Sequence, residues 1–238
     1  MSKFLPLLRG ELLRLWRYKI TLFGLLVSAI WLVIIALVNE QEANALLPQL
    51  LVIDSGLMSI VLLAASYFYE KQEGTIKAVL VSPTNPSVLL MAKVVGAMIG
   101  SYVTVILLWV TMLLIHQSHF PLLGAFYWIS LTTLAHISLG FVLIYWSHDF
   151  MDLLLKYTGF ALLLFVPVIL VSLNIIPSAM YWIANVSPTY AGQTGLLQIW
   201  QPFHLVDVVV ATVLLLIYPG ILFPFYILPQ FRKEAIRP

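Results

Sequence analysis

The stretch "VVGAMIGSYVTVILLWVTMLLI", residues 94–115, decides the fold of this chain. It runs without a single charged side chain, and roughly 20 predominantly apolar residues are enough for a helix to cross the hydrocarbon core of a bilayer. The strict alternation of apolar and polar residues that is typical of a membrane β-barrel strand is missing. The stretch therefore predicts a transmembrane helix.

Five more apolar runs of this kind occur in the chain, at about 20–38, 50–69, 126–146, 157–176 and 206–228. Of the 238 residues 62% are hydrophobic and 9% are charged, whereas soluble domains carry roughly 25% charged residues. We therefore expect an all-α integral membrane protein with six transmembrane helices in one transmembrane domain, residues 1–238. Cysteine is absent from the sequence, which excludes disulfides and Cys-ligated metals.

The basic residues are distributed on one side of the predicted membrane. None of the six runs contains Lys or Arg, and alternate connections hold all twelve: Lys3, Arg9, Arg14, Arg17, Lys19, Lys71, Lys77, Lys93, Lys156, Arg232, Lys233 and Arg237. Because connections rich in Lys and Arg stay in the cytoplasm, we expect both termini to be cytoplasmic.

The N-terminal segment, residues 1–19, has the spacing of an amphipathic helix. Its apolar face carries Leu8, Leu12 and Trp16, and its basic face carries Arg14 and Arg17. We expect an interface helix along the cytoplasmic membrane surface, with the basic face toward the lipid headgroups. The residues assigned to this helix are Leu8, Arg9, Leu12, Arg14, Trp16 and Arg17. A positive patch that only orients the first span is the alternative.

The longest polar stretch, "YEKQEGTIKAVLVSPTNPSVLLMAK", covers residues 69–93 between the second and third runs. Thr75 can cap a short helix over residues 76–81, and Pro83 would end that helix. The sequence therefore predicts a short capped helix on the cytoplasmic side.

A second cap follows at once. Asn85 before Pro86 predicts that the third transmembrane helix begins near residue 86. At about 1.5 Å per residue a helix over 86–115 would be about 45 Å long, more than a hydrocarbon core of about 30 Å requires. We expect this helix to protrude into the cytoplasm and to form an elbow with the preceding short helix, over residues 70–93.

The spacing of polar residues in the elbow is specific: Glu70, Glu73-Gly74-Thr75, Leu80, Ser82-Pro83 and Lys93. It resembles the signature of type-2 ABC exporter permeases, E-x-E-x-G-T-L-x-x-L-x-x-(S/T)-P, followed at the same distance by a lysine. Gln72 departs from that signature, since the family has an acid there and this chain has one at the next position. The chain length and "IDSG" at 53–56 look closest to small permeases that export drugs such as fluoroquinolones.

The resemblance implies a coupling helix between spans two and three that docks on a separate ATPase subunit. The residues it assigns to ATPase coupling are Glu70, Glu73, Gly74, Thr75, Ile76, Val79, Leu80, Ser82, Pro83 and Lys93. It also implies two copies of an ABC-type ATPase, a second copy of this permease or a close paralogue, and the cell membrane of a bacterium.

The chain contains no G-x-x-x-x-G-K-(S/T) motif that would cradle nucleotide phosphates. We therefore expect no cofactor and no catalysis in this chain, with ATP and Mg²⁺ bound by the partner ATPase. The predicted partners are that ATPase and the lipid bilayer, and not a nucleic acid.

The segment 177–205, between the fifth and sixth runs, carries no charged residue but several prolines and aromatic residues. It is too apolar for a simple loop and too often interrupted for a span. We expect short re-entrant or interfacial helices, with aromatic side chains at headgroup depth: Tyr181, Trp182, Tyr190 and Trp200. These side chains would anchor the segment in the membrane interface or line the outer mouth of the translocation path.

Polar residues inside spans mark candidate functional sites. A possible substrate path consists of Asp54, Ser55, Ser59, His136 and Asp207. In the alternative interpretation both acids are solvated near the outer interface, and His136 bonds to a neighbouring helix. The loop residues His148, Asp149 and Asp152 form a conceivable metal set, but a solvated turn is the more common use of this pattern, and we expect no metal.

Two functions compete. The first is a permease subunit of an ATP-driven exporter that moves a hydrophobic or amphipathic substrate such as a drug, lipid or peptide. The alternative is a stand-alone proton-coupled carrier in which Asp54, His136 and Asp207 titrate. A membrane-embedded enzyme is disfavoured, because the sequence lacks H-E-x-x-H and G-x-S-x-G motifs.

Overall fold

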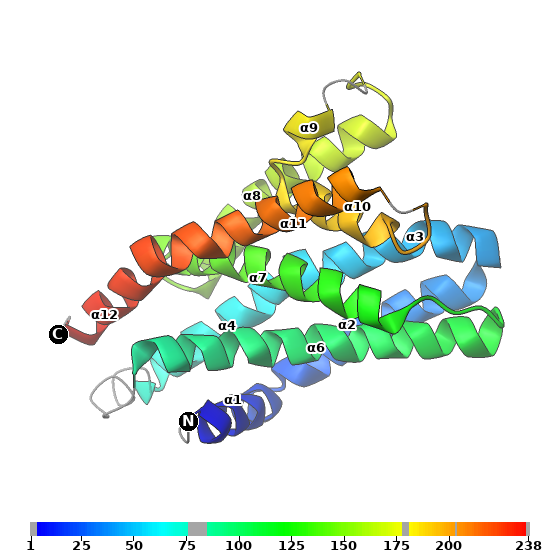
Figure 1. The fold of residues 1–238 in the computed structure, drawn as a ribbon. Coiled ribbons are helices and arrows are strands. Elements are labelled where there is room, and N and C mark those ends of the chain that lie inside the picture. Colours follow the sequence, from blue (N-terminus) through cyan, green and yellow to red (C-terminus); the bar gives the residue numbers. More distant parts are fainter. Residues whose placement is uncertain (1–3, 76–84, 178–180, 203, 237–238) are drawn as a thin grey trace.

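The computed structural model describes residues 4–75, 85–177, 181–202 and 204–236, and the regular elements among these residues are all helical (Figure 1). Six helical stretches are long and apolar enough to cross a bilayer: Ile20–Leu37, Glu40–Gln72, Pro86–Ile115, Leu122–Trp146, Phe150–Ser172 and Leu205–Lys233. Helices suit such sequences because each satisfies its own backbone hydrogen bonds in a medium without water. The predicted all-α, six-span membrane fold is confirmed.

The elements follow one another as α1 (Phe4–Arg17), α2 (Ile20–Leu37), α3 (Glu40–Val52), a π-helical segment (Ile53–Met58), α4 (Ser59–Gln72), α6 (Pro86–Ile115), α7 (Leu122–Trp146), α8 (Phe150–Ser172), α9 (Tyr181–Ala184), α10 (Pro188–Leu197), α11 (Leu205–Leu222), a second π-helical segment (Phe223–Ile227) and α12 (Leu228–Ile236). In Figure 1 the helices α1 and α12, the end of α4 and the start of α6 all lie at the same end of the bundle.

The second span begins about ten residues earlier than the sequence predicts. Asn39 caps α3: its side chain accepts a hydrogen bond from the Glu42 amide at 2.9 Å, and the Glu42 carboxylate accepts one from the Asn39 amide at 3.2 Å. This reciprocal capping box turns an apparently polar loop into the first helical turns. The helical stretch therefore covers 33 residues, and Asp54 lies near its middle.

The third span begins where the sequence predicts. The Asn85 side chain accepts a hydrogen bond from the Ser87 amide at 3.0 Å, Pro86 occupies the first turn, and the helix runs for 30 residues. The predicted short helix over 76–81, with Ile76, Val79 and Leu80, lies outside the described residues, as do Ser82 and Pro83.

The helix α7 is the centre of the bundle, in contact with α4, α6, α8, α10 and α11. Buried apolar side chains form two clusters along it. One contains Leu47, Leu108 and Trp128, and the other contains Tyr67 and Phe141. The second cluster also takes in Ile227 and Phe231 from the end of the sixth span, so both ends of the bundle are packed.

The short helices α9 and α10 lie in the segment between spans five and six. The helix α10 packs against α7, and Gly195 lies directly on the Trp128 ring, where an added Cβ would be 2.2 Å from a ring carbon. The Trp200 indole donates a hydrogen bond to the Asn44 side chain of α3 at 3.1 Å. The helix α10 and Trp200 are thus packed parts of the bundle, and the depth of the segment in the bilayer stays a prediction.

The Gly195 contact yields a test of this packing. We expect Gly195→Ala to destabilise the protein by about 1–3 kcal/mol, because the Trp128 ring must leave its position. The measurement is the thermal unfolding of the purified variant in detergent. A matched control is Gly220→Ala in α11, where an added Cβ meets nothing within 4 Å, and helix stability should stay the same or rise by up to about 1 kcal/mol. An unchanged melting temperature for Gly195→Ala would contradict this packing.

Candidate functional site

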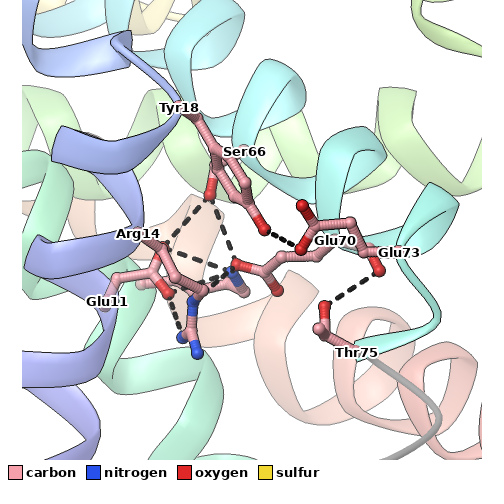
Figure 2. Close-up of polar contacts among 8 residues, drawn as sticks. Glu11, Arg14, Tyr18, Ser66, Glu70, Glu73 and Thr75 are labelled. Atoms are coloured by element: carbon pink, nitrogen blue, oxygen red, sulfur yellow. Dashed lines mark hydrogen bonds and ion pairs between the residues drawn. The ribbon is translucent and has the colours of Figure 1, made fainter.

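Charged side chains from three helices meet where α1, α4 and α6 come together (Figure 2). Glu11 and Arg14 come from α1, Glu70 from α4 and Lys93 from α6. The Lys93 Nζ lies 2.5 Å from Glu70 Oε1 and 3.2 Å from each carboxylate oxygen of Glu11. Lys93 and Glu11 are each 2% exposed, and Glu70 is 4% exposed. We call these four residues the charged cluster.

Arg14 completes the charged cluster. Its Nη2 lies 2.6 Å from Glu11 Oε2, and its Nε lies 3.2 Å from Glu70 Oε1. The hydroxyl of Ser66 lies 3.3 Å from Glu11 Oε1 and 3.4 Å from Glu70 Oε1, and donates to this pair of carboxylates. Two acids and two bases make the charged cluster formally neutral. Buried charges persist only when they are paired in this way.

The charges of the cluster also determine how Glu11 titrates. Burial is the largest single influence and raises the pKa of the Glu11 carboxyl, but the charges of Lys93 and Arg14 and the hydrogen bonds from both together outweigh burial. The pKa of Glu11 therefore lies below its ordinary value of 4.5, and the carboxylate is ionised at neutral pH.

The helix α4 ends within one turn of Glu70, the first residue of the elbow. The helix α4 ends at Gln72, and Gly74 follows with φ +70°, the left-handed conformation in which glycine commonly ends a helix. The Thr75 hydroxyl donates to the Glu70 carbonyl oxygen at 3.0 Å. The end of α4 is therefore held by the same residue that pairs with Lys93.

Tyr18, between α1 and α2, also contacts the elbow. Its hydroxyl donates to Glu73 Oε2 at 2.5 Å, and its ring stacks on Tyr69 with centroids 5.2 Å apart. Burial and the hydrogen bond to Glu73 raise the pKa of Tyr18 to about 12. Tyr18 thus stays a hydrogen-bond donor throughout the physiological pH range.

The structure corrects the predicted orientation of Arg14 in the interface helix. Arg14 points into the charged cluster and not toward lipid headgroups, because Glu11 and Glu70 attract it. Arg9, Trp16 and Arg17 are exposed, whereas Leu8 and Leu12 are partly buried. Sequence reasoning missed Glu11. One feature of the sequence could have indicated its role: Glu11 is the single acidic residue among residues 1–19 and lies three positions before Arg14, the spacing of an ion pair on one helix face.

Asp54, Ser55 and Ser59 lie in or beside the first π-helical segment. Such segments occur frequently at functional sites. The Trp31 indole donates to Asp54 Oδ1 at 3.3 Å. Asp54 is 9% exposed, which corrects the interpretation that it is solvated at the outer interface. The reason is that α3 lengthens the span by more than three turns before Asp54, back to Glu40.

His136 bonds α7 to α10. The His136 Nε2 lies 3.0 Å from the Thr189 hydroxyl, its Nδ1 lies 2.8 Å from the Thr132 carbonyl oxygen, and its ring packs against Gly56. This geometry favours the interpretation in which His136 bonds a neighbouring helix. Asp207 is exposed in the first turn of α11.

The loop before α8 caps the N-terminus of that helix. The Asp149 side chain accepts a hydrogen bond from the Asp152 amide at 2.8 Å, and Asp152 pairs with Lys156 at 2.7 Å. Over the ranges that the structure describes, no group of three His, Asp or Glu side chains is placed to hold a metal ion.

The arrangement is that of a membrane bundle whose N-terminal helix α1 is joined by ion pairs to the ends of two spans, α4 and α6. A model of the ABC-2 type transporter family matches residues 2–200. The chain belongs to this family. The match covers α1 to α10, and with six apolar helices it makes this ABC-2 transporter a multi-pass permease of the ABC type. The family implies an ABC ATPase partner that carries the ATPase activity, and contact with membrane lipids. No curated protein matches the chain.

Removing one member of the charged cluster should destabilise this ABC-2 transporter. Lys93→Met leaves the carboxylates of Glu11 and Glu70 with Arg14 alone, and breaking a buried ion pair in this way costs about 3–5 kcal/mol. Glu70→Gln leaves one excess positive charge and should cost a similar amount. The double variant restores neutrality through Glu11 and Arg14, so we expect most of the stability to return. Thermal unfolding of the three purified variants measures these changes in stability.

The control for the charged cluster is Lys156→Met. Lys156 pairs with Asp152 one turn away, and both side chains are partly exposed, so only a small change is expected. If the double variant is less stable than both single variants, Glu70 and Lys93 do not form the charge-balanced pair described above.

Acid should weaken the contribution of Glu11. Its pKa is lower in the folded protein than in the unfolded chain, so the ionised carboxylate stabilises the fold at neutral pH. That stabilisation is lost as the pH falls below 4.5 and through the lowered folded pKa. We expect the difference in melting temperature between the natural protein and Glu11→Gln to shrink between pH 5 and about pH 3. A difference that stays constant over this range would argue against the salt bridges of Glu11.

Proposed function

We propose that this permease exports a hydrophobic or amphipathic substrate, such as a drug, lipid or peptide, and is driven by separate ATPase subunits. Membership of the ABC-2 type transporter family supports an ATP-driven permease over the stand-alone proton-coupled carrier. The ATPase would bind ATP and Mg²⁺ and would act on the elbow between spans two and three.

The observation that carries this proposal is the position of the charged cluster. It joins α1, α4 and α6 through Glu11, Glu70 and Lys93, and Glu70 is the first residue of the elbow, one turn before Gly74. A movement of the ATPase against the elbow would displace the end of α4. Because the buried ion pairs connect α4 to α1 and α6, these two helices would move with it. Rigid-body movement of packed helices is a common way in which proteins transmit such a signal.

The proposed assembly contains two ATPase subunits and two permease chains, identical or paralogous, in the cell membrane of a bacterium. Both chain termini and the elbow would face the cytoplasm. The common location of α1, α12, the end of α4 and the start of α6 supports this topology (Figure 1). Arg14, Lys93 and Arg232 lie on these elements, as the positive-inside rule requires.

The chemistry of the bundle supports an apolar cargo. Of the basic side chains that the structure describes, Lys93 is buried, and both neighbouring carboxylates already pair with it. A phosphate or carboxylate on the cargo would therefore find no free buried cation within this part of the chain. Hydrophobic and amphipathic molecules do not need one.

Removing the ion pairs that join the helices of the charged cluster tests whether the cluster transmits movement from the ATPase to the permease. The Glu70→Gln, Lys93→Met double variant keeps the Glu11–Arg14 pair inside α1 but removes every ion pair between helices in the cluster. In proteoliposomes with its ATPase, we expect this variant to bind the ATPase normally, while export per ATP hydrolysed falls at least tenfold. Export is followed with radiolabelled substrate and hydrolysis by phosphate release.

Two controls accompany the transport measurement. Lys156→Met, which removes a partly exposed ion pair within α8 and an exposed hydrogen bond to the Trp146 carbonyl oxygen, should transport normally. The natural permease without ATPase should not transport when a pH gradient alone is applied. Transport driven by that gradient, and lost in Asp54→Asn, would instead establish the proton-coupled carrier.

A further inference from the structure

A cavity of about 130 Å³ lies between α1, α2, α4 and α6. Glu11 and Lys93 line one end of the cavity, and Asp54 and Thr104 line the other. Thr104 lies eleven residues after Lys93 on α6, which is about 16 Å along a helix. The cavity therefore runs lengthwise from the charged cluster to the middle of the second span.

The wall of the cavity is mostly apolar, with side chains such as Leu15, Phe23 and Leu62. Hydroxyl groups are interspersed, and among them Ser28 Oγ lies 2.8 Å from Thr104 Oγ1. An apolar wall with a few fixed polar groups is the usual composition of a site for small organic molecules.

The two ends of the cavity differ in charge balance. At one end Glu11 and Lys93 belong to the neutral charged cluster. At the other end the Asp54 carboxylate receives hydrogen bonds from Trp31 and Thr104, but it takes part in none of the ion pairs formed among the described residues. The cavity therefore carries one uncompensated acid.

We propose that this cavity binds a hydrophobic organic cation, a protonated amine or a quaternary ammonium, with Asp54 as its counter-ion. A buried carboxylate without a partner is unfavourable in an apolar medium, and a bound cation removes that penalty. The apolar wall selects an organic body over a bare metal ion, and the acid repels anions. The cation would be cargo if the proposed function holds, but binding itself needs no ATPase.

Binding is measured on the purified permease in nanodiscs, without ATPase. The probe is a slim fluorescent cation, 4-(4-dimethylaminostyryl)-N-methylpyridinium, and the matched neutral probe is the styrylpyridine that lacks the N-methyl group, at pH 8. We expect saturable fluorescence enhancement with the cation, at least tenfold weaker binding in Asp54→Asn, and retained binding in Asp54→Glu. The neutral probe should show no dependence on Asp54.

A variant that fills the cavity provides an independent test of cation binding. Gly100 lines the cavity, and an added Cβ there meets nothing within 4 Å, so Gly100→Leu should fill the space and weaken cation binding at least tenfold. The control is Gly159→Leu in α8, where an added Cβ also meets nothing within 4 Å but which does not line the cavity.

Three outcomes would overturn the proposal: full cation binding in Asp54→Asn, full binding in Gly100→Leu, or equal Asp54 dependence for the neutral probe. If Asp54→Asn does not fold, the Gly100→Leu variant and the comparison of the two probes decide. Failure of this binding assay leaves export by the ATPase complex untouched. Failure of that export test likewise leaves the binding result standing.

Discussion

The ammonium group of Lys93 is buried between the carboxylates of Glu11 and Glu70, and this interaction constrains the end of the bundle where α1, α4 and α6 meet. A charge in an apolar interior must be paired, so the three helices that carry these residues cannot separate without exposing an unpaired charge. The N-terminal helix α1 is for that reason part of the bundle, and is more than an anchor on the membrane surface. Tyr18 strengthens the same connection through Glu73.

The two sets of buried acids in the bundle have different consequences. Glu11 and Glu70 are neutralised by Arg14 and Lys93, and their effect is mechanical, because they join helices. Asp54 is held by hydrogen bonds from an indole and a hydroxyl, and its charge is left for a ligand. The cavity connects these two environments. A movement that begins at the elbow would therefore reach the walls of the cavity through α4 and α6, two of the four helices that line it.

Local signals in the sequence predicted local structure well. The Asn85-Pro86 cap marked the beginning of α6, because both residues act through their own backbone and immediate neighbours. The capping box at Asn39 and Glu42 is equally local, and a search for that reciprocal pair would have found the start of α3. Glu11 was missed for a different reason: its partner Lys93 lies 82 positions further along the chain, and no periodicity connects the two.

The sequence by itself determined that the protein is a six-span helical membrane protein, because segment length and hydrophobicity decide which segments leave water. It also carried the spacing of the elbow that resembles ABC exporter permeases. Only the tertiary structure decided that Arg14 turns inward, that Asp54 is buried in mid-span, and that a cavity joins Asp54 to the charged cluster. Those features depend on how helices far apart in the chain pack against one another, since a side chain acquires its partner, and a cavity its walls, only when several helices meet.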